Sequence, residues 1–168
     1  MKEIFVDLFT NGLFIVPLGS WVFSQIVKVI INLFVERRFV FERLFGDGGM
    51  PSGHSATVSG LMFTSGWCYG FGSPIFAICA ILAVIVMHDA TGVRREAGKQ
   101  ATTIKQLTEA INGFITEKDQ QVKAEKLKEL VGHTPLQVFF GVVIGIIATV
   151  LYCLIGGVEY CSLQSIVF

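Results

Sequence analysis

Charged residues are scarce in this chain, and the few that occur cancel. Only 15% of its 168 residues are charged, with thirteen basic residues against thirteen acidic ones. A zero net charge gives no general attraction to nucleic acid. The composition is 52% hydrophobic with a mean hydropathy of +0.65, well above that of a typical soluble domain. The sequence therefore predicts one integral membrane domain, residues 1–168, whose main partner is membrane lipid.

A disulfide pattern and a cleavable leader are also missing. The cysteines show neither C-x-x-C spacing nor paired loop positions, and they lie in or beside apolar segments: Cys68, Cys79, Cys153 and Cys161. This distribution predicts buried thiols. The first apolar run follows a single lysine and contains no small-x-small cleavage site, so it is expected to be retained.

Proline marks three helix starts, because it is favoured at the first helical position. The predicted helices cover about 51–69, 74–90 and 135–158. Another apolar segment, 4–35, exceeds the roughly 20 residues needed to cross hydrocarbon. Two alternatives stay open for it: a single crossing, or a split at Pro17 and Gly19 into an interfacial or re-entrant piece and a helix over 20–35. The predicted fold class is all-α, a polytopic membrane bundle with about four transmembrane helices.

The basic residues are unevenly distributed. Eleven of the thirteen fall in two segments: Arg37, Arg38 and Arg43, then Arg94, Arg95, Lys99, Lys105, Lys118, Lys123, Lys126 and Lys128. A hairpin of the helices 51–69 and 74–90 places both segments on one face. The positive-inside rule then predicts a multi-pass cell-membrane protein with this face, and the functional site on it, in the cytoplasm.

The second basic segment belongs to a charged helical insertion at about 91–134. Its apolar residues are spaced to form one helical stripe: Ile104, Leu107, Ile111, Phe114 and Ile115. This pattern predicts an amphipathic cytoplasmic helix that lies on the membrane surface or covers the site. The alternative is a solvated charged helix packed on its own neighbours.

Small residues recur four positions apart, as in Ser55 and Ser59, Ala56 and Gly60, and Gly141 and Gly145. Such pairs permit close contact between membrane helices. They predict packing within one chain, and the alternative is a homodimer interface through Gly141 and Gly145.

Ionisable residues whose side chains could take part in catalysis or anion binding are predicted to lie at one membrane boundary. His54 lies about 17 residues before the predicted hairpin turn, and His88 and Asp89 lie about 17 after it, so all three are about 25 Å from the turn. His133, Arg94, Arg95 and Lys99 border the neighbouring helix ends, and Lys28 lies inside the first helix, where an ionisable group usually faces a polar cavity. Headgroup contact or topology alone would also account for each of these residues singly.

A glycine-rich helix start lies at the same boundary, over 48–53. Its free N–H groups suit an anion, and the nearby Arg and Lys residues make phosphate the natural ligand.

Three segments carry a family resemblance: "GGMPSGHSA", "DATGVRREAGKQA" and "LKELVGHTPLQV". The first contains the P-S-G-H motif of type 2 phosphatidic acid phosphatases and vanadium haloperoxidases. Together the three segments resemble the divergent branch of that family, bacterial and plant membrane proteins described as acid phosphatase/vanadium-dependent haloperoxidase related.

The resemblance implies a lipid-phosphate phosphatase. In the larger family one histidine attacks phosphorus, a carboxylate orients it, and the P-S-G-H histidine protonates the leaving oxygen. The implied general acid is His54, and the backbone around Ser52 and Gly53 would hold phosphate with Lys28, Arg94, Arg95 and Lys99. This chemistry requires no metal or cofactor. The expected substrate is an anionic lipid phosphate such as a phosphatidylglycerophosphate, a phosphatidate or a polyprenyl phosphate.

Two motifs of the larger family are absent. Lys28 precedes Arg37 by nine positions with no proline after Arg38, and Arg94 and Arg95 follow His88 instead of preceding it. His133 is the preferred nucleophile because it lies in the branch's own pattern, and His88 is the alternative. Asp89 is expected to orient the nucleophile or to organise the phosphate site.

Two other functions compete with this phosphatase hypothesis. One is a metal-dependent hydrolase using Asp47, His88, Asp89 and His133. The other is a protein that binds or transports an anionic lipid without catalysis.

Overall fold

All regular structure in the described residues is helical, as the sequence predicts. The computed structural model describes residues 2–36, 49–114 and 132–157. Its helices are α1 (Lys2–Thr10), α2 (Gly12–Glu36), α3 (Gly53–Tyr69), α4 (Pro74–Thr91), α5 (Val93–Phe114) and α6 (Pro135–Tyr152), followed by a π-helical turn at Cys153–Gly157. The predictions made for residues 37–47, Ile115, 118–128 and Cys161 lie outside the described residues.

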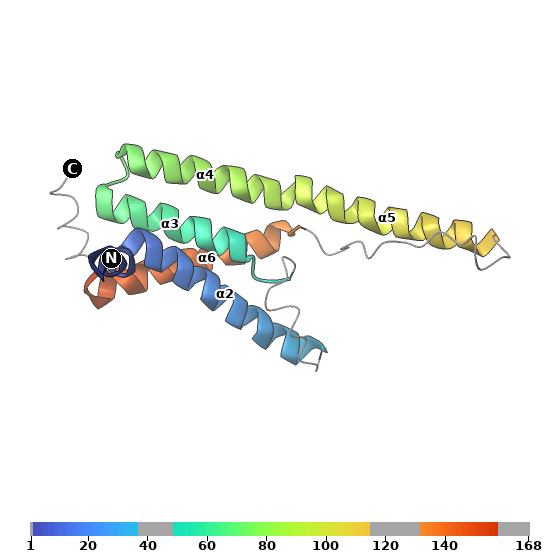
Figure 1. The fold of residues 1–168 in the computed structure, drawn as a ribbon, viewed down its shortest axis with the longest axis horizontal. Helices are drawn as coiled ribbons and strands as arrows, with labels where there is room; N and C mark the ends of the chain where they lie inside the picture. Colours follow the sequence, from blue (N-terminus) through green and yellow to red (C-terminus); the bar gives the residue numbers. More distant parts are fainter. Residues whose placement is uncertain (1, 37–48, 115–131, 158–168) are drawn as a thin grey trace.

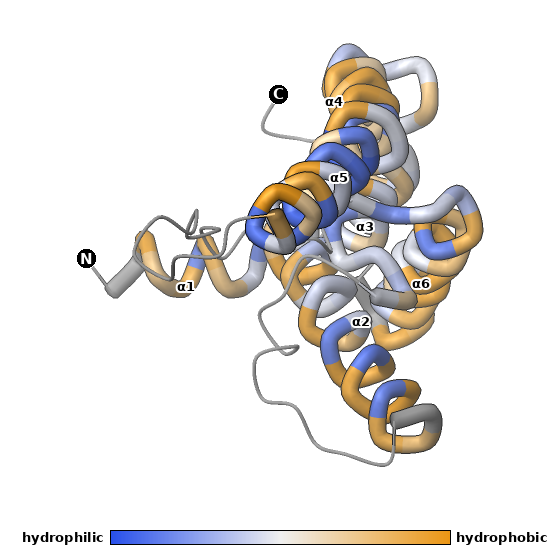
Figure 2. Tube along the Cα trace, turned by 90° about the vertical axis from the view of Figure 1, so that its right-hand side faces the viewer, coloured by the Kyte–Doolittle hydropathy of each residue, from blue (hydrophilic) through white to orange (hydrophobic). Residues whose placement is uncertain are grey.

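Helix α3 lies at the centre of the bundle. It packs against α2, α4 and α6, and nine of its 17 residues are buried. The surrounding helices are the more apolar ones, and Figure 2 shows apolar residues along α2, α4 and α6. Small and hydroxyl-bearing residues therefore form the interior, while large apolar side chains face outwards, towards the expected lipid.

Three helical stretches among the described residues are long and apolar enough to cross a membrane: Gly12–Phe34, Pro74–Phe114 and Pro135–Ile155. About four crossings were expected. Helix α3 is the difference, because it has only 17 residues and is less apolar than α2, α4 and α6. A helix enclosed by three apolar helices does not need an apolar surface of its own, so α3 runs beside them without the composition of a lipid-facing span (Figure 1).

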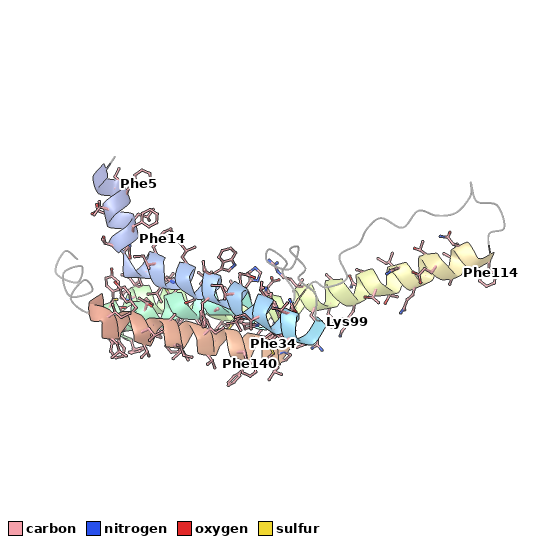
Figure 3. The ribbon with its side chains drawn as sticks, turned by 90° about the horizontal axis from the view of Figure 1, so that it is seen from below. Phe5, Phe14, Phe34, Lys99, Phe114 and Phe140 are labelled. Carbon is pink, nitrogen blue, oxygen red and sulfur yellow. The ribbon has the colours of Figure 1, made fainter. Side chains whose placement is uncertain are left out.

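The N-terminal apolar segment is broken at Asn11, so the predicted break at Pro17 and Gly19 is wrong. The side chain of Asn11 accepts the N–H of Leu13 at 2.9 Å, which caps the new helix. Pro17 lies inside α2 and is buried. Helix α1 is thereby separated from α2, and its large apolar side chains, including Phe5, are exposed (Figure 3). This geometry fits the interfacial alternative for the N-terminal piece.

The charged insertion begins as an extension of α4. The two helices meet at Gly92, and α5 projects away from the bundle, with Lys99 near its start and Phe114 at its far end (Figures 1 and 3). The predicted stripe of Ile104, Leu107 and Ile111 is about half exposed, at 47–56%. The described part of the insertion therefore does not cover the site, because its direction is set by α4.

The glycines of α6 pack within one chain. A methyl group on Gly141 would meet the carbonyl oxygen of Ser52 and the side chain of Ser55, and one on Gly145 would meet Ser59 and the backbone of α3. Both glycines are buried against α3, which is the packing within one chain that the sequence predicts. The alternative, a homodimer interface through them, stays a prediction.

The cysteines only partly match expectation. Cys79 is a buried free thiol and Cys153 a partly buried one. Cys68, near the end of α3, is disulfide-bonded, which corrects the prediction made for it. Spacing along the chain does not reveal pairs that only the fold brings together.

Candidate functional site

The three resembling segments meet at one end of the bundle. The N–H of Ser52 donates to the carbonyl oxygen of Gln137 at 3.0 Å, and the N–H of His133 donates to that of Ala90 at 2.9 Å. Gly132 adopts φ +100°, and any side chain there would collide with the backbone of Arg94 and Arg95. The start of α3, the end of α4 and the start of α6 are thus fixed to one another by main-chain contacts.

Two histidines face each other at this junction. The rings of His54 and His133 have centroids 6.1 Å apart with planes tilted by 59°. His133 is only 2% exposed, whereas His54 is half-buried. The two rings are thus in contact range of each other, and His54 is the more exposed of the two.

Lys28 reaches the same region from α2. It is only 1% exposed, and a methyl group added to Gly49 would lie 3.5 Å from its side-chain carbons Cγ and Cδ. A buried lysine is costly in a membrane bundle unless its charge is balanced, so a position beside the glycine-rich loop indicates a polar or anionic neighbourhood.

The start of α3 offers two backbone donors. The Oγ of Ser52 accepts the N–H of Ser55 at 3.3 Å and its hydroxyl at 2.9 Å, so this side chain caps the helix. The N–H groups of Gly53 and His54 belong to the first turn, for which a helix supplies no acceptor. The first-turn donors at the predicted phosphate site are therefore the N–H groups of Gly53 and His54, and the Ser52 side chain caps the helix.

The acidic residue is placed differently from the prediction. Oδ2 of Asp89 accepts the Nε–H of Arg94 at 2.6 Å, and both side chains are around two-fifths exposed, at 41% and 43%. The group at Nδ1 of His133 is instead Oε1 of Gln137, at 3.2 Å. An exposed ion pair of this kind contributes little to stability, so Asp89 serves mainly to hold Arg94 at the edge of the site.

The remaining predicted residues lie further out. Lys99 pairs with Glu96 at 2.6 Å on the exposed surface of α5. The side chain of His88 is exposed, and Arg95 reaches the junction through its backbone. The structure therefore brings together His54 and His133, with the backbone of Arg94 and Arg95 against Gly132 and with Lys28 beside Gly49 of the glycine-rich loop.

Gln137 was missed by the sequence analysis. The signal was present as Thr134-Pro135-Leu136-Gln137, the T-x-x-Q pattern of a capping box, and both of its hydrogen bonds form at the start of α6. In a capping box the side chain of the fourth residue folds back to the residue at the helix start. Because this start directly follows His133, the pattern predicts that the Gln137 amide lies within reach of the His133 ring.

An apolar groove of about 280 Å³ runs between α2 and α6. Its lining is formed by Phe23, Val27, Ile31, Met50, Pro51, Phe140, Val143 and Ile144. Met50 and Pro51 directly precede Ser52, and Val27 directly precedes Lys28. Two parts of the groove lining are therefore next in sequence to residues of the predicted site.

The metal-binding alternative can be compared with the described residues. Among residues 2–36, 49–114 and 132–157, no three His, Cys, Asp or Glu side chains gather as a group that could hold a metal ion. Asp47, one of the four residues in that hypothesis, lies outside them.

Comparison with known proteins gives one family. The profile described as "Divergent PAP2 family" matches residues 9–148. The "Uncharacterized membrane protein YuiD" of Bacillus subtilis (strain 168) is 44% identical over 150 residues, which cover 86% of this chain and 95% of that protein. No solved structure matches the chain. The matched range includes every residue of the site described above.

Proposed function

The chain belongs to the divergent PAP2 family of membrane proteins, and from this premise we propose that it is a phosphatase that hydrolyses a lipid phosphomonoester. The observation that carries the proposal is the pair of histidines, His54 and His133, with ring centroids 6.1 Å apart. Phosphoryl transfer depends mainly on positioning and charge neutralisation. A nucleophile and a proton donor facing one anion site meet the first requirement.

The two histidines have different roles. A nitrogen of His133 attacks phosphorus, and the bond from phosphorus to the lipid oxygen breaks as His54 donates a proton to that oxygen. Water, deprotonated by His54, then breaks the phosphorus–nitrogen bond and releases inorganic phosphate. The 2% exposure of His133 protects the intermediate, and the half-buried position of His54 suits a group that exchanges protons with water.

Charge neutralisation comes from three elements. Lys28 supplies a buried cation, the N–H groups of Gly53 and His54 supply first-turn donors, and Arg94 supplies a guanidinium group at the rim. The Nε of Arg94 is engaged by Asp89, which leaves the outer end of its fork for a phosphate.

The groove between α2 and α6 supports a lipid substrate. It is apolar throughout its lining, it lies between two helices that can span a membrane, and its lining residues Val27 and Pro51 directly precede Lys28 and Ser52 in the sequence. A phosphate at the histidine pair therefore allows an acyl or prenyl chain to lie in the groove. Phosphatidate-like, phosphatidylglycerophosphate-like and polyprenyl-phosphate-like lipids all meet this description.

The site is proposed to face the cytoplasm. Arg94, Arg95 and Lys99 lie at its end of the bundle, which the positive-inside rule assigns to that side. Cys68 is disulfide-bonded near the opposite end of α3, and disulfides persist in oxidising compartments outside the cytoplasm. A Gln106→Cys variant should resist a membrane-impermeant maleimide in intact cells and react after permeabilisation. Labelling in intact cells would place α5 outside.

The proposal is tested by phosphate release from a lipid phosphate in detergent micelles. His54→Asn and His133→Asn should each lower turnover by about a hundredfold or more, because each removes a group that transfers a proton or forms a bond. The matched control is His88→Asn, which changes an exposed histidine of α4 and should retain turnover. Full activity in both site variants would overturn the proposal.

The same assay separates the competing functions. Loss of turnover with a chelator, restored by Mg²⁺ or Zn²⁺, would favour the metal-dependent hydrolase. Lipid binding without any phosphate release in the wild type would favour the non-catalytic lipid-binding or transport protein.

The substrate class has a test of its own. Val143→Trp should block the groove and lower turnover of a long-chain lipid phosphate about tenfold relative to a short-chain one, because overpacking a fitted cavity costs about 1–3 kcal/mol. Ile147→Trp, on an exposed part of α6, is the control. An unchanged chain-length preference in Val143→Trp would remove the groove from the substrate site.

A further inference from the structure

One oxygen of Gln137 accepts two hydrogen bonds. The backbone N–H of Thr134 donates to Oε1 at 2.9 Å, and Nδ1 of His133 lies 3.2 Å from the same atom. A backbone N–H is always a donor, so the side-chain atom it contacts is the amide oxygen and not the amide nitrogen. The orientation of the Gln137 amide is thereby fixed.

This orientation decides where the proton of His133 lies. An amide oxygen only accepts, so Nδ1 of His133 must carry the hydrogen. In a neutral imidazole the lone pair then resides on Nε2. We propose that Gln137 is a positioning residue that holds His133 in the Nδ1–H form and presents Nε2 as the attacking atom. The second half of this statement rests on the proposed phosphatase function.

The surrounding contacts make Gln137 suited to this role. Its main-chain carbonyl oxygen accepts the N–H of Ser52, so the same residue joins the start of α6 to the start of α3, which carries His54. The backbone of His133 is fixed separately by the carbonyl oxygen of Ala90. Gln137 thus sets the orientation of one histidine ring and ties its helix to the helix that carries the other.

A neutral amide also limits what the residue can do. It cannot take up a proton, and it stabilises an imidazolium less than a carboxylate does. Its contribution is therefore the choice of nitrogen and the orientation of the ring, and Asp89, paired with Arg94, does not share it.

The test combines a spectroscopic signature with turnover. Full-length protein labelled with ¹⁵N-histidine is examined in detergent by NMR, with the His133 signals assigned from their loss in His133→Asn. Three variants are compared with the wild type. Gln137→Leu removes the acceptor, Gln137→Glu keeps an oxygen for both donors, and Thr134→Ala removes the reciprocal cap while leaving the Gln137 amide in place.

We expect the wild type, Gln137→Glu and Thr134→Ala to show His133 protonated at Nδ1 when neutral. Gln137→Leu should show a mixture of the two neutral forms and lose about tenfold in kcat, the worth of one well-placed hydrogen bond. A merely structural role predicts instead that Thr134→Ala and Gln137→Leu lose activity together with no change of protonated nitrogen.

Two results would overturn the inference. One is a wild-type spectrum with the proton on Nε2 of His133, and the other is an unchanged spectrum and kcat in Gln137→Leu. If Gln137→Leu does not fold, the wild-type and Gln137→Glu spectra still decide which nitrogen is protonated. A protein that releases no phosphate but shows Nδ1–H at His133 would refute the phosphatase proposal while leaving the assignment of the proton intact.

Discussion

Helices α3 and α5 distribute their side chains in opposite ways. In α3, small and hydroxyl-bearing residues such as Ser55, Ser59 and Thr64 are fully buried. In α5 only Gly98 and Ala101 of its 22 residues are buried, while Leu107 is 56% exposed. The place of each helix in the bundle decides which of its side chains are buried. Helix α3 is surrounded by other helices, and these neighbours carry the apolar surface on their outer sides. Close approach at the centre requires small residues. The hydroxyls of Ser59 and Ser65 donate to carbonyl oxygens of α3, whereas Ser55 donates to Oγ of Ser52 and Thr64 pairs with Thr149 of α6.

The largest expected effect comes from widening the central contact. Gly145→Ala adds a methyl group that would overlap with the Ser59 side chain and with backbone atoms of α3. We expect a loss of about 1–3 kcal/mol in the free energy of unfolding, together with loss of activity, because α3 positions His54. Thermal unfolding in detergent measures the change.

The control for this variant is Gly19→Ala on α2. A methyl group there meets nothing within 4 Å, so it should leave stability unchanged or raise it by up to about 1 kcal/mol through better helix propensity. Equal melting temperatures for the two variants would contradict the central role of α3.

The next effect distinguishes two lysines. Lys28 is buried beside the glycine-rich loop, whereas Lys105 lies on the exposed surface of α5. Lys28→Met keeps the length of the side chain and removes the charge, so turnover should fall about tenfold to a hundredfold through loss of a charged hydrogen bond to phosphate. Lys105→Met should retain wild-type turnover in the same assay. Equal turnover in both variants would mean that the buried charge serves only the fold.

The sequence predicted much of the fold and the convergence of the three motif segments at one end of the bundle. The roles of the site residues stay predictions. The prolines at 51, 74 and 135 lie within two residues of the starts of α3, α4 and α6. The hairpin geometry predicts that His54 lies at the level of the end of α4. The observed contacts of His133 and Gly132 with that end agree with this prediction. These successes rest on local signals and on helix geometry, which the sequence encodes directly.

The predictions that differ from the structure concern side chains that have more than one possible partner. Asp89 could pair with His133 or with Arg94, and only the direction of the side chains after the bend at Gly92 decides for Arg94. The sequence pattern favours a break at Pro17, but a proline is tolerated within a packed membrane helix, and the break lies at Asn11 instead. The Cys68 disulfide and the contact between Gln137 and His133 are likewise set by neighbours that the linear pattern does not name.

The smallest expected effect concerns the stripe on α5. Leu107→Ser and Ile111→Ser change side chains that are 56% and 47% exposed, so each should alter the free energy of unfolding by no more than about 0.5 kcal/mol. The matched change in α3 is Val58→Ser, at a side chain only 9% exposed, which should cost at least about 1 kcal/mol. Thermal unfolding of all three in one detergent provides the comparison. A loss of stability in Leu107→Ser as large as that in Val58→Ser would show that the stripe on α5 is covered in the folded protein. Helices α3 and α5 would then both be buried and would differ only in what covers them.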